Sequence, residues 1–374
     1  MTTSAATANP TATATARAVS KPIANSKPEK SKSRTLTWVN SASGWFEALG
    51  FAWVVPLLKI AAGDNRSEQY KELRQVLLIP LLGISAFLLG WAVFAPRVTT
   101  SLGAIPGPVQ VMHQFGNLLS EHTREREKQD AFYERQDLRN AKLVEDGKAD
   151  KVKHRTYTGK PTYLDQILTS IRTVGLGFLI ATLIAVPLGI ASGLSKTINS
   201  AINPLIQLFK PVSPLAWLPI VTMIVSALYV NVHDAMPKSL VISAITVTLC
   251  SMWPTLINTA LGVASVDTDL MNVSKVLRLS TWKTVTKLVL PSALPLIFTG
   301  LRLSLGVGWM VLIAAEMLAQ NPGLGKFVWD EFQNGSSQSL ARIMVAVLTI
   351  GVIGFLLDRI MYALQRAFTF TSNR

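Results

Sequence analysis

Six stretches of apolar residues, separated by charged segments, recur along this 374-residue chain. Crossing the core of a lipid bilayer takes about 20 apolar residues in a helix, and a helix satisfies its own backbone hydrogen bonds there. The stretches cover residues 76–96, 173–195, 211–232, 239–266, 288–318 and 340–364. This pattern predicts an all-α, polytopic membrane protein with six transmembrane helices.

Composition and charge agree with that class. Only 16% of the residues are charged and 49% are hydrophobic, which is typical of a membrane protein rather than a soluble domain. The net charge is +14, and Lys and Arg gather before the first stretch, between the fourth and fifth, and at the C-terminus. Cytoplasmic segments carry such an excess, so we expect both termini in the cytoplasm. Because orientation explains the basic balance, and no basic motif is interleaved with aromatic residues, we expect no nucleic-acid partner.

Two kinds of sequence precede the first apolar stretch. Residues 1–37 are rich in Thr, Ala, Lys, Pro and Ser, which predicts a disordered cytoplasmic tail, with a transit peptide as the alternative. Residues 38–62 contain three Trp together with Glu47, Pro56 and Lys59, as in a helix that lies in the membrane interface. We therefore assign 38–74 to an interfacial amphipathic segment. If 38–62 spanned the membrane instead, the N-terminus would lie outside.

A charged insertion at about residues 97–160 interrupts the membrane domain, which is expected over 75–374. Its centre, 121–153, is almost wholly charged and helix-forming. The predicted topology places this insertion outside the cell, and loops longer than about 60 residues are translocated despite positive charges. Both a solvated charged hairpin and a docking element for an external binding protein fit this composition.

The segment before the fifth stretch is amphipathic and basic. Val266, Leu270, Val273 and Leu277 recur at helical spacing and share one face. Ser280 stands where it can cap a second short helix. A basic, amphipathic loop between two spans predicts a docking surface for a partner protein.

This loop resembles the cytoplasmic Glu-Ala-Ala loop of bacterial ABC importer permeases, whose pattern ends in Leu-Pro. When residues 288–291 are aligned with the end of that pattern, Asn272, Val273 and Ser274 take the Glu-Ala-Ala positions, and Arg278 takes the place of a turn-forming Gly. In the family the loop inserts into a groove of the ATPase subunit. By this resemblance the coupling loop covers about residues 264–291, with Asn272, Val273, Ser274, Leu277, Arg278, Ser280, Leu290 and Pro291 as its functional residues.

Further motifs resemble the nitrate, bicarbonate, sulfonate and taurine branch of these permeases, and nitrate permeases above all. They run from about residue 102 to residue 357. They are Ile105-Pro106-Gly107-Pro108, Ser170-Ile171-Arg172, Gly177-Phe178, Pro187-Leu188-Gly189, Gly300-Leu301-Arg302 and Ala315-Glu316-Met317.

The resemblance implies a six-helix importer permease in the bacterial inner membrane. Its expected partners are cytoplasmic ABC ATPase subunits, an extracytoplasmic solute-binding protein, a second permease copy in a homodimer, and membrane lipid. Its expected cargo is a small oxyanion, nitrate first, with nitrite, bicarbonate, cyanate, sulfonates and taurine as alternatives. We expect no cofactor on this chain, because the partner ATPase would use the ATP.

Catalytic chemistry has little support in the sequence. Residues 323–326 imitate part of a phosphate-binding loop, but Gln320 and Phe327 stand where that motif requires Gly and Ser or Thr. The single cysteine, Cys250, and the four histidines show no metal-ligand spacing. An ion-coupled secondary transporter is the alternative to the importer, although we find no internal inverted repeat of the kind such transporters contain.

Charged residues inside the apolar stretches are the candidates for an anion path. Arg302 lies roughly 15 Å into its helix at 1.5 Å per residue, where an arginine either contacts the cargo or belongs to a structural pair. Glu316 has a structural or gating role, and Lys210 has the same ambiguity as Arg302 near the cytoplasmic boundary. The candidate translocation path comprises Arg302, Glu316, Trp217, Trp253 and Trp309, the tryptophans either lining a cavity or packing against neighbours.

Overall fold

The computed structural model describes residues 43, 44, 46, 50–61, 66–100, 103–229, 236–336 and 338–369. The tail predicted over residues 1–37 lies outside the described residues. The elements, in chain order, are α2 (Val54–Ala61), α3 (Arg66–Leu73), η1 (Arg74–Leu78), α4 (Ile79–Phe94), η2 (Ala95–Arg97), β1 (Thr99–Thr100), β2 (Gly103–Ala104), α5 (Pro108–Glu145), η3 (Ala149–Lys151), α6 (Tyr163–Leu194), α7 (Lys196–Phe209), α8 (Pro214–Leu228), α9 (Lys238–Ala264), α10 (Thr268–Val276), α11 (Thr281–Thr284), η4 (Val285–Val289), α12 (Leu290–Ala319), α13 (Leu324–Asn334) and α14 (Ser339–Thr369). The two short strands pair antiparallel, with Thr99 opposite Ala104.

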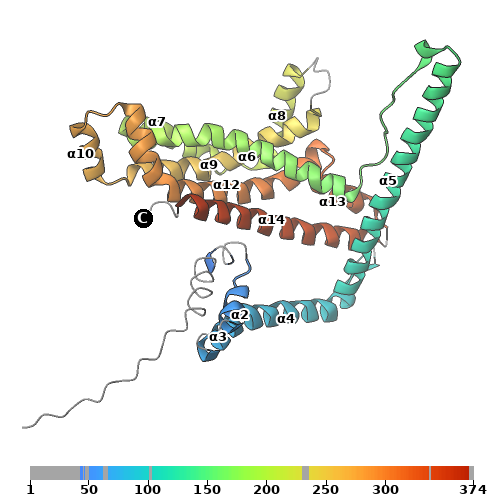
Figure 1. Cartoon of the computed structure of the whole chain (residues 1–374), viewed down its shortest axis with the longest axis horizontal. Coiled ribbons are helices and arrows are strands. Elements are labelled where there is room, and N and C mark those ends of the chain that lie inside the picture. Colours follow the sequence, from blue (N-terminus) through green and yellow to red (C-terminus); the bar gives the residue numbers. More distant parts are fainter. Residues whose placement is uncertain are drawn as a thin grey trace, which may run out of the picture.

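Three long helices, α6, α9 and α12, form the centre of the bundle, and α14 packs along α12 (Figure 1). Small residues allow the close approach. A Cβ added at Gly177 of α6 would lie 2.8 Å from the Ala244 carbonyl oxygen of α9, and one at Gly300 of α12 would lie 2.8 Å from Asn258. Helices inside a membrane associate through such close packing, because lipid tails are as apolar as leucine.

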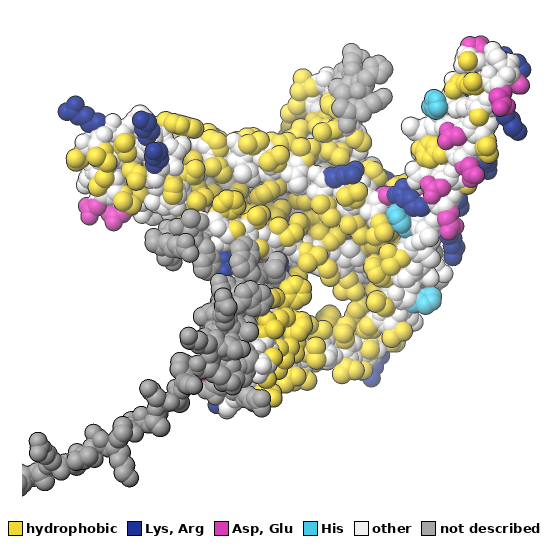
Figure 2. Space-filling model, in the orientation of Figure 1, with side chains coloured by type: hydrophobic (Ala, Val, Ile, Leu, Met, Phe, Trp, Pro, Cys, Tyr) yellow, Lys and Arg dark blue, Asp and Glu magenta, His cyan; other side chains and the backbone are white. Residues whose placement is uncertain are grey.

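Within the described part of the chain, five helices are long and apolar enough to cross a membrane, or six if one bent pair is counted as a span. The five are 67–97, 163–194, 238–264, 281–319 and 339–369. Hydrophobic side chains cover the sides of the bundle, whereas charged side chains gather on α5 and around α10 (Figure 2). This distribution fits an apolar belt between two aqueous ends.

The third predicted span is corrected by the structure. Residues 211–232 were expected to cross the membrane as one helix, but α8 has only 15 residues, and it meets α7 at a bend of 103°. The cause lies in Pro211 and Pro214, which remove two backbone donors at the junction between the helices. The apolar residues here therefore belong to a bent pair, α7 with α8, and not to one straight helix.

The described residues just before α4 are largely helical. Helix α2 has 8 residues, too few to cross a bilayer, and α3, η1 and α4 form one continuous helix from Ser67. Helix α4 lies apart from the central helices (Figure 1) and contacts the rest of the bundle near its end, where the Trp91 indole N–H donates to the Pro106 carbonyl oxygen at 3.1 Å. Of the predicted interfacial segment 38–62, residues 38–42, 45, 47–49 and 62 lie outside the described residues.

The charged insertion is a helical hairpin with an extended return. Helix α5 runs for 38 residues, and the chain comes back alongside it. Gln136 accepts from the Arg155 backbone N–H at 2.7 Å, and Asn140 donates to the Lys153 carbonyl oxygen at 3.1 Å. The hairpin projects from the end of the molecule opposite α10 (Figure 1).

Candidate coupling surface and membrane pathway

The segment predicted to dock a partner forms two short helices joined by a tight turn. Asp267 caps α10 by accepting from the Asp269 backbone N–H at 2.9 Å. Ser280 caps α11 by accepting from the Lys283 N–H at 3.4 Å, as the sequence predicts. The two helices therefore begin where short polar side chains satisfy their free backbone donors.

Arg278 makes the turn between these helices. Its backbone has φ of +48°, the left-handed region that glycine normally occupies. The Arg278 N–H donates to the Lys275 carbonyl oxygen and the Leu279 N–H to that of Ser274, each at 3.0 Å. These are the two bonds of a Schellman motif, which ends a helix. The turn that a family glycine would allow is therefore made here by an arginine.

Apolar side chains of the two helices remain uncovered. Val276 is 82% exposed, Trp282 76% and Val273 49%. Large exposed apolar patches on soluble surfaces mark sites of protein contact. We call the exposed side chains of residues 267–287 the coupling surface. Its basic members are Lys275, Arg278, Lys283 and Lys287, and its acidic members are Asp267 and Asp269.

The eight residues assigned to the coupling loop do not all face solvent. Asn272, Val273, Leu277, Arg278, Ser280 and Pro291 are exposed. Ser274 is buried, where its hydroxyl donates to the Met271 carbonyl oxygen at 2.8 Å, and Leu290 is half-buried. Their roles in coupling stay predictions.

The coupling surface is joined to the bundle by a small buried cluster. Val289 and Ala293 are fully buried with Val263 and Ile297, and Met271 of α10 packs against this cluster. Just before α12 the helix widens, because the Leu290 N–H reaches back five residues to the Val285 carbonyl oxygen and Pro291 has no N–H to offer. A movement of α10 would therefore be transmitted through these contacts to the end of α9 and the start of α12.

Arg302, a candidate path residue, belongs to an ion pair between α12 and α14. Its guanidinium binds the Asp358 carboxylate with two nitrogens, one of them at 2.7 Å, and lies 5.3 Å from the Tyr362 ring centroid. Both charged side chains line a cleft of about 670 Å³. Asp358 was not predicted as its partner, because contact with a residue on another helix cannot be read from spacing along one helix.

Glu316 lies at the other end of α12 and is fully buried. The Ser170 hydroxyl of α6 lies 2.8 Å from one of its carboxylate oxygens, and the Gly325 N–H of α13 donates to the same oxygen at 3.0 Å. A Cβ at Gly323 would lie 2.1 Å from this carboxylate. The glycines that imitate a phosphate loop therefore make room for Glu316, which ties three helices together.

The three candidate tryptophans fall in two places. Trp309 packs at the α12–α14 contact, where its indole N–H donates to the Ile350 carbonyl oxygen at 3.0 Å. Trp217 and Trp253 both lie against Phe209, with ring centroids 5.7 and 6.4 Å from that ring. Among the described residues, neither of these two indole N–H groups has a hydrogen-bond partner. The five candidates thus do not converge on one site.

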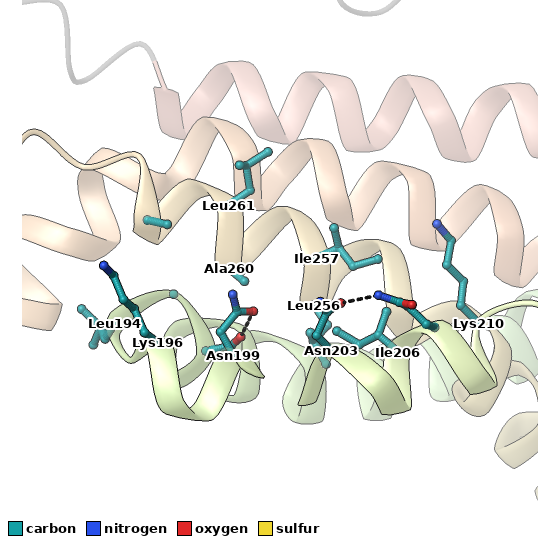
Figure 3. A pocket seen from close by; sticks show the side chains of 14 residues that line it. Leu194, Lys196, Asn199, Asn203, Ile206, Lys210, Leu256, Ile257, Ala260 and Leu261 are labelled. Atoms are coloured by element: carbon teal, nitrogen blue, oxygen red, sulfur yellow. Dashed lines mark hydrogen bonds between the residues drawn. The ribbon is translucent and has the colours of Figure 1, made fainter. Parts of the chain in front are cut away.

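Another cleft lies between α7 and the C-terminal ends of α6 and α9. It has a volume of about 740 Å³ (Figure 3). One side of it is lined by Lys196, Asn199, Asn203 and Gln207 of α7 and by Lys210 at the C-cap of that helix, and the other side by apolar residues of α9. The sequence analysis considered only Lys210. Spacings of three, four, four and three residues between these five polar positions are the signal that could have identified the whole set.

Comparison with known proteins identifies the family of this chain. A family model described as "Binding-protein-dependent transport system inner membrane component" matches residues 185–370. The bicarbonate transport system permease protein CmpB of Synechococcus elongatus is 36% identical over 306 residues, which are 81% of this chain and 94% of that protein. The chain therefore belongs to the family of binding-protein-dependent transport system inner membrane components, as its motifs indicated. It is a multi-pass inner-membrane protein.

Other relatives carry different substrate names. The nitrate import permease protein NrtB of Synechocystis sp. is 38% identical over 54% of this chain and 68% of that protein. The taurine transport system permease protein TauC of Escherichia coli is 32% identical over 57% of this chain and 74% of that protein. Among solved structures, an inward-facing form of the MetNI methionine ABC transporter aligns with a TM-score of 0.49 and 12% identity, over 55% of this chain and 95% of that chain.

Proposed function

We propose that this chain imports a small oxyanion as the permease subunit of an ATP-driven transporter, with nitrate as the first candidate cargo. Nitrite, bicarbonate, cyanate, sulfonates and taurine are the alternatives. Family membership supports the transport class, and the names of the relatives, which include bicarbonate and nitrate permeases, support the cargo class.

The observation that carries the proposal is the coupling surface. Its exposed apolar residues, Val276 and Trp282 above all, stand on short helices that the buried Val289 cluster joins to α9 and α12. A surface built in this way fits a groove on a separate ATPase chain. In this account ATP is bound and hydrolysed on that partner, and this chain contributes no catalytic group.

The same connection supplies a mechanism for transport. Closure of two ATPase subunits around ATP would move α10 on each permease copy, and the Val289 cluster would pass that motion to α9 and α12. The bundles would then exchange between inward-open and outward-open arrangements, because binding that favours one arrangement shifts the population toward it. A solute-binding protein would deliver the anion at the hairpin end. The second permease copy is identical to the first in this proposal.

A single substitution tests the coupling surface. Val273→Asp places a charge where the partner groove would exclude water, and an unpaired buried charge is costly. We expect the variant to lose both ATPase co-purification and ATP-dependent uptake. Val144→Asp is the matched control, because Val144 is 57% exposed on the hairpin, at the opposite end of the molecule. If Val273→Asp retained both properties, the surface would have no docking role.

A further inference from the structure

Helix α7 carries one polar stripe. Its members are Lys196, Asn199, Asn203, Gln207 and Lys210. At 100° per residue they fall within an arc of about 80°, and all five side chains are exposed along the cleft between α7 and α9. Figure 3 shows the two lysines at opposite ends, with the Asn199 and Asn203 amides between them.

The other faces of α7 have different environments. Ile206 is buried against Trp253 and Leu256, whereas Leu205 and Leu208, on the side away from the cleft, are exposed. Helices α7 and α8 together have the apolar length of a membrane span. Lipid does not accept a row of amides and ammonium groups. The stripe therefore requires water or polar ligands, while the leucines suit lipid or a neighbouring protein.

The charges of the cleft favour anions. Two lysines and no acidic residue occur among the fourteen side chains that line it. The donor ends of the amides are also free within the described structure. The Ser192 hydroxyl donates to Asn199 Oδ1 at 3.0 Å, and Gln207 Nε2 donates to Asn203 Oδ1 at 3.3 Å. With their carbonyl oxygens occupied, both asparagines present N–H groups to an acceptor.

The cleft also lies in a suitable position along the bundle. Leu194 and Ala264, at the ends of α6 and α9, line it close to the start of α10. Lys210 lies about 21 Å from Lys196 along α7, at 1.5 Å per residue. Beside Lys210, the unpartnered indole N–H groups of Trp217 and Trp253 surround Phe209. The stripe thus runs from the coupling end into the apolar belt.

We propose that this stripe lines the cytoplasmic half of the route of the transported anion, with Lys196 and Lys210 concentrating a small oxyanion and the Asn199 and Asn203 amides hydrogen bonding to it in passage. The inference rests on the proposed oxyanion import and adds the residues that contact the cargo. It replaces the path through Arg302 and Glu316, whose charged groups are occupied by Asp358, Ser170 and the Gly325 N–H.

Cysteine labelling of the whole transporter in lipid nanodiscs tests the route. In a Cys250→Ala background, Asn203→Cys should react with both a sulfonate-bearing and a trimethylammonium-bearing methanethiosulfonate. A cleft of one charge sign raises the local concentration of counter-ions about tenfold or more. The anionic reagent should therefore react with Asn203→Cys about tenfold faster than the cationic one, once each rate is divided by the rate of that reagent with a free thiol in solution. Leu208→Cys, which is 63% exposed on the apolar side of the same helix, should react with neither reagent.

Two further measurements complete the test. Replacing Lys196 and Lys210 by Gln should abolish the preference for the anionic reagent, and nitrate should slow the labelling of Asn203→Cys more than chloride does. An Asn203→Cys as unreactive as Leu208→Cys, or equal rates for the two reagents, would overturn the route. A wild-type transporter that accumulates none of nitrate, nitrite, bicarbonate, cyanate, sulfonates and taurine would instead overturn the proposed cargo, and the labelling rates would still show whether the cleft is open to water and favours anions.

Discussion

At the scale of single residues, Arg278 shows a backbone position under strain. A non-glycine residue in the left-handed region costs roughly 1–2 kcal/mol, and a β-branched residue fits it worst. The strain is held by the Schellman hydrogen bonds that end α10. The alignment with the Glu-Ala-Ala pattern located this turn from sequence, but the φ of +48° could be known only from the fold.

We therefore predict opposite effects of two substitutions at this position. Arg278→Gly should raise the midpoint of thermal unfolding or leave it unchanged, because relief of about 1–2 kcal/mol of strain offsets the added freedom of the unfolded chain. Arg278→Val should lower the midpoint, by about 1–2 kcal/mol in unfolding free energy. Arg278→Lys, which keeps the charge and the strain, is the control. A more stable Val variant than Gly variant would contradict the turn described here.

The Arg302–Asp358 pair supplies a second residue-scale prediction. Arg302→Gln and Asp358→Asn should each destabilise the protein, because the first leaves the Asp358 carboxylate with only the 3.9 Å contact of Arg359 and the second leaves the Arg302 guanidinium without a carboxylate. The double variant should lose less stability than the sum of the two single losses. The coupling free energy should be on the order of 1 kcal/mol, because both side chains are partly exposed and solvent weakens their attraction. Thermal unfolding of the wild type, the two single variants and the double variant measures this coupling. Retained nitrate uptake in the double variant supports a structural role for the pair. Additive losses would mean that the two side chains do not interact.

At the scale of elements, the hairpin shows what a charge pattern can and cannot predict. Its helix-forming, charged composition indicated α5, but not the return segment, which is held by contacts between residues far apart in sequence. Tyr157 on that segment donates to Glu125 Oε1 at 2.7 Å, and its backbone N–H donates to the Tyr133 hydroxyl at 3.2 Å. These contacts depend on which groups meet across the hairpin.

The hydrogen bond between Tyr157 and Glu125 makes the hairpin sensitive to pH. It lowers the pKa of the Glu125 carboxyl and raises the pKa of the Tyr157 phenol. The carboxyl contribution is present above its unfolded pKa and lost as pH falls through the lowered folded pKa. The phenol contribution is present below its unfolded pKa and lost as pH rises through the raised one.

The hairpin should consequently be most protected at neutral pH and open at both extremes. Hydrogen exchange of residues 152–160, corrected for the intrinsic rate, measures this protection. Tyr157→Phe should remove the dependence at high pH and reduce the dependence at low pH, where Lys128 still contacts Glu125 at 3.2 Å, while Tyr133→Phe weakens the hairpin but keeps both. A wild-type profile that matches the Tyr157→Phe profile would rule out the contribution of this bond.

At the scale of the whole molecule, apolar length predicted five of the six membrane elements. It failed for residues 211–232, where hydropathy registers composition but not the bend that Pro211 and Pro214 impose. The two short helices α10 and α11 were located because a family pattern and helical spacing coincide there. The partners of Arg302 and Glu316 were not predicted from the sequence. Asp358 contacts Arg302 and Ser170 contacts Glu316 only because helices distant in sequence pack together. The stripe on α7 was missed because its asparagines carry no charge in a segment assessed by charge alone.

The central claim is that ATP hydrolysis on a partner, acting through the coupling surface, drives import. Its most direct test is uptake of labelled nitrate by proteoliposomes that contain this chain with its ATPase, with the binding protein added on the hairpin side. The account predicts accumulation that requires ATP on the α10 side together with the binding protein, and that Val273→Asp abolishes. Accumulation driven by a proton or sodium gradient without the ATPase would contradict it and favour a secondary transporter.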